Sequence, residues 1–193
     1  IYSVFKNNQL TLVATDGRRL AMADFDIEVP DSQEAAVIIP TKCVNQLQSL
    51  LKDEGDMRIR IGQKQIAFEL NKNLVVSKLI EGNYPNYRQV IPGPAKHRVT
   101  LEREVTMKAL QRVALLAADK STSIKLAFSQ DNIEIMANAA DIGEAHESLA
   151  VKYNGPDMAI AFNQEYLMAP FRNLDVDEIF IDLIDEVSPG VLK

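Results

Sequence analysis

Apolar and polar residues alternate along several short stretches of this chain, and most of these stretches lead into a polar turn. Alternation with a period of two is typical of a strand with one buried face, and a turn between two such stretches predicts an antiparallel hairpin. We therefore predict hairpins, or parts of hairpins, around the turns at residues 7–8, 62–64, 129–132 and 188–190.

A further hairpin is predicted in the segment LVATDGRRLAMAD, residues 12–24. Asp16 and Gly17 lie between two apolar runs, and glycine supplies the positive φ that a tight primed turn requires. The turn does not explain why Arg18, Arg19 and Leu20 follow, so this corner of the chain should have a second role.

Apolar residues at helical spacing predict three helices, over residues 42–52, 103–118 and 163–174. Their starts are 61 and 60 residues apart, which indicates an internal repeat of strand, helix, hairpin and further strand. Pro170 should kink the third helix because it removes a hydrogen bond. The expected core-facing residues are Cys43, Val44, Leu47, Leu50, Leu51, Thr106, Met107, Leu110, Val113, Ala114, Ala117, Tyr166, Leu167, Phe171 and Leu174.

Helices that alternate with antiparallel hairpins predict an α+β fold. One helix cannot cover the sheet of its own repeat, so we expect repeats to pair, sheet to sheet, with their helices together. Pro92, Gly93 and Pro94 interrupt regular structure, and a boundary there gives domains at residues 1–92 and 93–193. Because the chain begins inside a predicted strand and ends just after another, we expect it to be a piece of a longer protein.

Composition limits the classes of partner. The net charge of −6, from 21 basic and 27 acidic residues, argues against a surface that coats nucleic acid as a whole. Contact with a polyanion would need a locally basic face. No apolar stretch approaches the ~20 residues of a membrane-spanning helix, so no membrane partner is expected. A single cysteine excludes an internal disulfide and fits a reducing cytoplasm.

The candidate catalytic and metal-binding residues lack the neighbours that such chemistry requires. Cys43 lies on an apolar helix face, as a core thiol does, and His97 and His146 are too few for a zinc site. The sequence holds no phosphate-binding glycine loop and no catalytic triad, so we predict no enzyme activity, metal or cofactor. We expect a solvated face rather than a magnesium site from the acidic run Asp175, Asp177, Glu178, Asp182, Asp185 and Glu186.

The outer faces of the predicted helices carry the basic residues Lys42, Lys52, Arg103, Lys108, Arg112 and Arg172. A basic helix face is usually a solvated surface, but three equivalent helices would align these residues into one basic surface in an acidic protein. Leu115 falls on the basic side of the second helix rather than in its core arc. With Leu116, it is a candidate subunit contact.

Five segments, in order and at matching spacing, make the chain resemble the bacterial sliding clamp family, the beta subunits of DNA polymerase III. They are VATDGRRLAMAD, VIIPTKCVNQLQSLL, SKLIEGNYPNYRQVIP, NIEIMANAADIGEAHESLAVKY and AFNQEYLMAPFRNL. The resemblance implies a fold of repeated βαβββ units whose helices line a ring and whose antiparallel sheets form the outside. Residues 1–92 would be the C-terminal part of the middle domain, and residues 93–193 the last domain without its C-terminal strand.

The function that the resemblance implies is non-catalytic. The family's members are cytoplasmic bacterial homodimers that encircle duplex DNA without reading its sequence and make polymerases processive. The basic helix residues named above would face the DNA, and Leu115 and Leu116 would lie at the subunit interface. Ser121 and Gln89 depart from the family pattern, in which an aromatic residue and an arginine occur.

The resemblance also implies a cleft that binds short linear motifs of polymerase subunits, of the clamp loader and of other replication and repair proteins. The residues matching its walls are Thr15, Gly17, Arg19, Leu20, Pro85, Val90, Asn163, Tyr166 and Val187.

A repeat-built adaptor that binds peptides and has no nucleic-acid role is the alternative interpretation. Charge reversal of Lys108 and Arg112 should matter only for a clamp. An enzyme is a third interpretation, which treatment with a chelator and a thiol reagent would expose.

Overall fold

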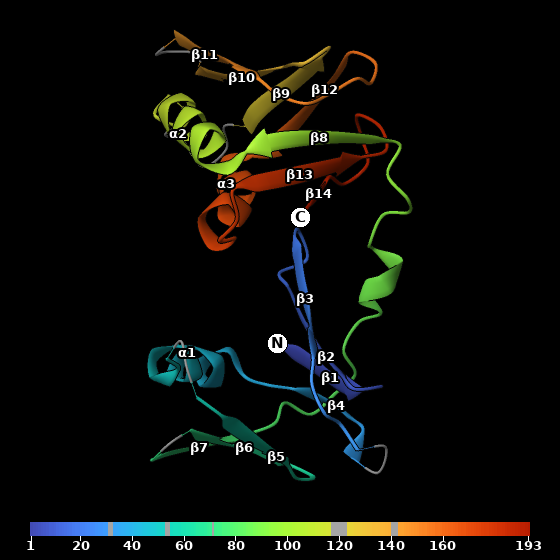
Figure 1. Ribbon diagram of the computed structural model, residues 1–193, viewed down its shortest axis with the longest axis vertical. Helices are drawn as coiled ribbons and strands as arrows, with labels where there is room; N and C mark the ends of the chain where they lie inside the picture. The colour runs from blue at the N-terminus through green and yellow to red at the C-terminus, as the bar shows by residue number, and fades with distance from the viewer. Residues whose placement is uncertain (31–32, 53–54, 71, 117–122, 140–142) are drawn as a thin grey trace. The chain divides into compact units, whose positions relative to one another are not determined.

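The computed structural model describes residues 1–193 except 31–32, 53–54, 71, 117–122 and 140–142. The chain forms two compact units, residues 1–88 and 89–193 (Figure 1). Both units combine antiparallel sheets with helices, so the fold is α+β, as the sequence predicts.

The first unit contains two antiparallel sheets, in the strand orders β3-β2-β1-β4 and β5-β6-β7. Helix α1 packs the buried side chains of Cys43 and Leu47 against Ile66 and Phe68 of β6. The elements are β1 (Tyr2–Lys6), β2 (Gln9–Thr15), β3 (Leu20–Asp26), β4 (Ala35–Ile38), α1 (Thr41–Leu50), β5 (Met57–Ile61), β6 (Gln65–Leu70) and β7 (Asn73–Lys78), followed at the unit boundary by the short 3-10 helix η2 (Tyr87–Gln89).

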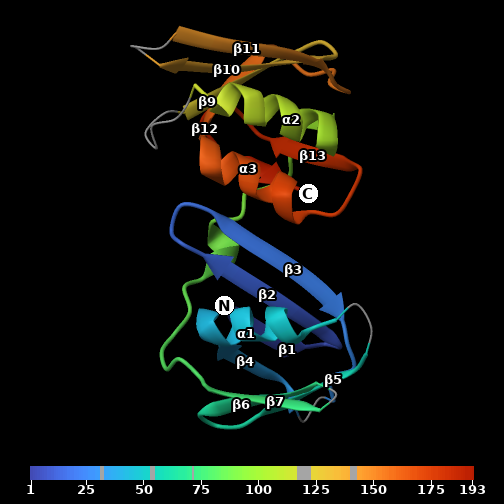
Figure 2. The same cartoon turned by 90° about the vertical axis from the view of Figure 1, so that its left-hand side faces the viewer.

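The second unit also contains two antiparallel sheets, ordered β11-β10-β9-β12 and β14-β13-β8. Its two longer helices, α2 and α3, pack against each other (Figure 2) and share one core with strands of both sheets. The elements are β8 (His97–Glu102), α2 (Arg103–Ala114), β9 (Ser123–Ser129), β10 (Asn132–Ala139), β11 (Gly143–Ala150), β12 (Met158–Asn163), α3 (Gln164–Asn173), β13 (Glu178–Leu183) and β14 (Val191–Leu192).

The predicted repeat is confirmed in the order of the elements. The sequence strand, helix, strands occurs at β4-α1-β5-β6-β7, at β8-α2-β9-β10-β11 and at β12-α3-β13-β14. In the second unit the repeats exchange their first strands: β8 pairs with β13 of the following repeat, and β12 pairs with β9 of the preceding one. Each sheet is therefore built from both repeats.

The predicted hairpin turns are also confirmed. Asn7 and Asn8 join β1 to β2 with φ of 53° and 56°, and Asp131 between β9 and β10 has φ of 53°. Two-residue turns between twisted strands need this left-handed conformation, which Asn and Asp tolerate better than most residues.

Helix ends are where the prediction is wrong. Helix α2 ends at Ala114, while the predicted end at residue 118 and the predicted core residue Ala117 lie outside the described residues. Leu51 was expected in the core, but α1 ends at Leu50 and the extended backbone of Leu51 takes its side chain off the helical stripe to an exposed position. Helix α3 continues through Pro170, and the kink stays a prediction.

Candidate functional site

The TDGRRL corner is the loop of the β2–β3 hairpin. Thr15 pairs with Leu20, so the loop holds four residues instead of the two of the primed turn that the Asp-Gly pair predicted. Oδ1 of Asp16 accepts hydrogen bonds from the backbone N–H groups of Arg18 and Arg19, each at 3.0 Å. An aspartate that caps the N–H groups two and three residues ahead favours this wider loop. Gly17, with φ of +85°, provides the left-handed residue within it.

Side chains of the same corner also stabilise it, through hydrogen bonds to its backbone and an ion pair. Oγ1 of Thr15 donates to the carbonyl of Arg19 at 2.7 Å and accepts from the N–H of Gly17 at 3.1 Å. Oδ2 of Asp16 lies 3.0 Å from Nε of Arg19. The backbone hydrogen bonds from Arg18 and Arg19 lower the pKa of the Asp16 carboxyl. This corner, which hydrogen bonds and an ion pair hold in one conformation, contains four of the predicted cleft residues: Thr15, Gly17, Arg19 and Leu20.

Pro85 belongs to the irregular segment that follows β7. The ring of the neighbouring Tyr84 stacks on Tyr2 of β1 with centroids 4.6 Å apart, and its hydroxyl lies 3.5 Å from the carbonyl of Val13. This segment is therefore fixed on the sheet that carries the TDGRRL corner, and Pro85 itself is exposed.

In the second unit, Asn163 caps helix α3. Its Oδ1 accepts from the N–H groups of Glu165 at 3.0 Å and of Tyr166 at 3.4 Å, as an N-cap asparagine does. The side chain of Tyr166 is half-buried in the first turn of the helix, and Val90 is exposed after η2.

Val187 occupies the loop between β13 and β14, where its side chain is 92% exposed. Oδ1 of Asp185 accepts from the N–H groups of Val187 at 3.0 Å and of Ser188 at 2.7 Å. Glu186 ties the loop to β12, the strand that leads into Asn163, through a 3.0 Å hydrogen bond from the N–H of Ala159. The structure thus brings Val187 and Asn163 onto neighbouring segments of this unit.

The acidic run is not the uniformly solvated face that was expected. Asp182 is only 5% exposed, because its position on β13 faces Arg98 of the neighbouring β8. Nε and Nη2 of Arg98 lie 2.6 and 2.8 Å from the two carboxylate oxygens, and Nζ of Lys193 lies 2.8 Å from one of them. The hydrogen bond from Arg98, supported by Lys193, holds the pKa of Asp182 at about 2. Asp185 is also half-buried and serves its loop, so the expectation is wrong for both residues.

The six basic residues predicted on the helices differ in their surroundings. Five lie in a helix, whereas Lys52 lies two residues beyond the end of α1. Arg103 donates from Nε to the carbonyl of Val176 and from Nη1 to that of Phe171 in α3, so it joins the start of α2 to the end of α3. Arg112 forms a two-pronged ion pair with Glu147 of β11, and Lys108 pairs with Glu104 one turn away. The side chains of the remaining three, Lys42, Lys52 and Arg172, are exposed.

Leu115 follows the last residue of α2 and is 77% exposed, while Leu116 is half-buried. The helical periodicity therefore placed Leu115 correctly outside the core. A subunit contact through these two residues stays a prediction.

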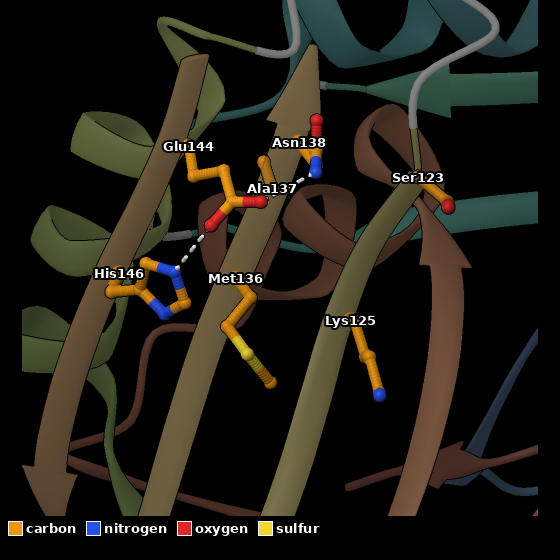
Figure 3. A pocket seen from close by; sticks show the side chains of 7 residues that line it. All are labelled: Ser123, Lys125, Met136, Ala137, Asn138, Glu144 and His146. Carbon is orange, nitrogen blue, oxygen red and sulfur yellow. Dashed lines mark hydrogen bonds and ion pairs between the residues drawn. The ribbon is translucent and has the colours of Figure 1, made fainter. Parts of the chain in front are cut away.

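Other candidate chemistry is sparse. The thiol of Cys43 is buried in the core of the first unit, as expected. On the β9–β10–β11 sheet, a hollow of about 460 Å³ is lined by Met136, Ala137 and five polar residues, among which Glu144 contacts His146 and Asn138 (Figure 3). The described part of the chain holds no group of three or more side chains placed to bind a metal ion. Within that same part, no helix is long and apolar enough to cross a membrane.

The chain matches two family models in succession. The model of the central domain of the DNA polymerase III beta subunit matches residues 1–86, and that of its C-terminal domain matches residues 88–193. The beta sliding clamp of Chlamydia pneumoniae is 31% identical over 186 residues, which are 96% of this chain and 51% of the relative. The beta sliding clamp of Pseudomonas aeruginosa is 33% identical over 184 residues, which are 95% of this chain and 50% of the relative.

Solved structures agree with these matches. The DNA polymerase III subunit beta of Pseudomonas aeruginosa superimposes with a TM-score of 0.93 at 31% identity, covering 99% of this chain and 53% of that one. The sliding clamp of Bacillus subtilis gives a TM-score of 0.94 at 26% identity, covering 100% and 52%. The fold is that of a sliding clamp. The chain belongs to the DNA polymerase III beta subunit family, and it spans about half the length of the curated relatives it matches.

Proposed function

We propose that the protein to which this chain belongs is a DNA polymerase processivity factor of the bacterial cytoplasm. As a homodimeric ring it encircles duplex DNA, holds replication and repair proteins to it and performs no catalysis itself. The observation that carries this proposal is the succession of the central and C-terminal clamp domain models along the chain. In these terms residues 1–92 are the C-terminal part of the middle domain and residues 93–193 most of the last domain.

Peptide binding is the part of the proposal that the local geometry supports best. Peptide sites combine exposed apolar anchors with a few well-placed polar groups. Val187 and Val90 are exposed apolar residues, Leu20 and Tyr166 are half-buried, and Arg19 adds a cation. We propose that the site residues on each unit contribute to binding short, mostly apolar motifs of polymerase subunits and of the clamp loader. A Pseudomonas aeruginosa sliding clamp has been solved bound to griselimycin, so a relative binds a ligand.

The basic helix residues are proposed to attract the DNA backbone without reading its sequence. Lys42, Lys52 and Arg172 support this role best, since their side chains are exposed and their charges suit phosphate. Lys108 contributes as well, because an exposed pair such as Lys108–Glu104 is weak and exchanges readily. Arg103 and Arg112 add positive charge while holding α2 in place.

Leu20→Asp in the full-length protein tests the peptide site. We expect at least a tenfold loss of affinity for a fluorescently labelled polymerase motif peptide, with a melting temperature within a few degrees of the wild type. Leu74→Asp is the matched control, because Leu74 is an exposed leucine on another sheet of the same unit. If Leu20→Asp unfolds the protein, Leu20→Ala replaces it. Unchanged affinity in a folded Leu20 variant would contradict the proposal.

Charge reversal tests the DNA contact and separates the clamp from a peptide-binding adaptor. Lys42→Glu combined with Lys52→Glu should lower the retention of the full-length protein on duplex DNA at low salt. The control reverses Lys64, in the turn between β5 and β6, and Lys78, the last residue of β7, which are also exposed. Equal retention of the two double variants would favour the adaptor.

A further inference from the structure

Two loops that carry proposed peptide-binding residues are held by the same arrangement, an aspartate that accepts backbone hydrogen bonds. Asp16 caps the N–H groups of Arg18 and Arg19, and Asp185 caps those of Val187 and Ser188. In both loops one carboxylate oxygen accepts from the residues two and three positions ahead. The loops belong to different units, so the shared arrangement is not a consequence of one local fold.

The loop of Val187 is also held by a hydrogen bond to β12 and by packing of its backbone on an aromatic ring. Glu186 accepts the hydrogen bond from Ala159 of β12 at 3.0 Å. At the other end, a Cβ on Gly190 would come within 3.1 Å of the Phe162 ring, so the backbone there packs directly on an aromatic side chain. Between these attachments the side chain of Val187 is almost entirely exposed to water.

An exposed valine gains nothing from burial in the unbound protein, so burial of this side chain is not what orders the loop. The backbone hydrogen bonds that the carboxylates of Asp185 and Glu186 accept supply that order instead. Ordering a loop costs conformational entropy, and a site whose loops are ordered on folding avoids that cost on binding.

We propose that Asp16 and Asp185 are positioning residues of the peptide site, whose carboxylates hold Arg19 and Val187 in the geometry that the peptide contacts. The inference rests on the peptide binding proposed above. In this arrangement neither aspartate touches the peptide; each acts through the loop it caps.

The two carboxylates are not equivalent. Asp185 acts through Oδ1, which an asparagine can replace as an acceptor. Asp16 uses Oδ1 for the backbone and Oδ2 for Nε of Arg19, and the second contact depends on its negative charge. Hydrogen bonds from Ser188 at Asp185 and from the backbone at Asp16 lower both pKa values, so both groups are ionised at neutral pH.

The experiment compares alanine and asparagine at each position in the full-length protein, with the affinity for the labelled motif peptide and the melting temperature as readouts. We expect Asp185→Ala and Asp16→Ala to weaken binding at least threefold while the melting temperature changes by a few degrees at most. Asp185→Asn should restore binding to within twofold of the wild type, and Asp16→Asn should restore it partly. Asp175→Ala and Asp26→Ala are the matched controls, since both aspartates are exposed and lie outside the two loops.

The outcomes separate the two proposals. Wild-type affinity in both alanine variants, with Leu20→Asp still impaired, would overturn the positioning role and leave the peptide site standing. Failure of Asp185→Asn to restore binding would also overturn it, because the acceptor geometry would then not be what matters. If the wild type does not bind the peptide at all, the proposed function fails and the positioning role fails with it.

Discussion

The two units differ in how much core their helices build. In the second unit α2 and α3 pack against each other, and one buried cluster takes side chains from both helices and both sheets. In the described part of the first unit, α1 is the single α-helix. Its buried cluster joins Cys43 and Leu47 only to Ile39 and to three side chains of β6, which are Ile66, Phe68 and Leu70.

The consequence is visible on the inner strands. The edge strands β3 and β11 have no buried residue in either unit, but β9 and β10 each bury three side chains where β1 and β2 each bury two. A repeat of this kind therefore completes its core only when two helices meet. The second unit should accordingly hold most of the stability of this chain, and four measurements test that difference.

Leucine-to-alanine substitutions in the two helices should show the largest effect. Leu110 of α2 is 1% exposed within the larger cluster, and Leu110→Ala should lower the free energy of unfolding by about 3–5 kcal/mol. The matched change Leu47→Ala in α1 should cost nearer 2 kcal/mol, since a thinner core relaxes more easily into the space left. Hydrogen exchange followed in each unit gives the two values separately. An equal or larger loss at Leu47 would reverse the comparison.

The buried carboxylate of Asp182 should contribute about 2 kcal/mol to the second unit at neutral pH. Its pKa is about 2 when folded against an ordinary value of 3.8, so the unfolded chain binds the proton more readily. The contribution is present above about pH 4 and is lost as the pH falls through the range from 4 to 2.

Melting temperatures of the wild type and of Asp182→Asn between pH 7 and pH 2 check this expectation. The two curves should lie apart at neutral pH and converge in acid. Asp175→Asn, at an exposed position, is the control and should follow the wild type throughout. A constant gap at all pH values would show that lost packing, and not the ion pair, causes the difference.

A small effect is expected from the ion pair between Arg112 and Glu147, although its geometry is good. The Arg112 side chain is 55% exposed and that of Glu147 is 27% exposed, and an ion pair that solvent reaches contributes little. Arg112→Gln should lower the melting temperature by no more than about 2 °C at low salt, and the difference should vanish in 1 M salt because ions screen the pair. A larger, salt-independent drop would assign Arg112 a packing role in the second unit.

The smallest change is expected at Ser3 in the first unit. Its hydroxyl is fully buried and has no hydrogen-bond partner among the described residues. Ser3→Ala should therefore be neutral, or should stabilise by up to ~1 kcal/mol. Thr11→Val is the contrasting variant, because the Thr11 hydroxyl donates to Asp24 at 2.6 Å and its loss should destabilise. Urea unfolding of both variants gives the sign of each change.

The sequence predicted those parts of the fold that depend on neighbouring residues. Alternation located the hairpins, and helical spacing located the repeat, because both patterns repeat within a few residues. The end of α1 was predicted at residue 52, but the helix stops two residues earlier, at Leu50, because periodicity gives no signal for where a helix stops. The wider TDGRRL loop was missed because the carboxylate of Asp16, and not glycine alone, decides its length.

The side-chain interactions in and around the candidate site were predicted less completely than the fold. Asp182 was misassigned because its partner Arg98 is 84 residues away, and no local pattern reports such a pairing. Asp185 was grouped with the other acids although a turn-initiating aspartate ahead of Val187-Ser188-Pro189 was a readable signal for a capped loop. The resemblance to clamps supplied the proposed peptide-binding residues, whose side chains alone would have been assigned to an ordinary interface.

The exchange of first strands between repeats has a consequence for how the second unit forms. Residues 97–102 of β8 complete their sheet only with residues 178–183 of β13, so neither repeat can close a sheet alone. Pairings between strands so distant along the chain slow folding, because closing a long loop costs entropy before the stabilising contacts between the strands can form. During translation β8 leaves the ribosome long before β13 is made. Until then β8 is an unpaired strand whose edge can pair with other chains.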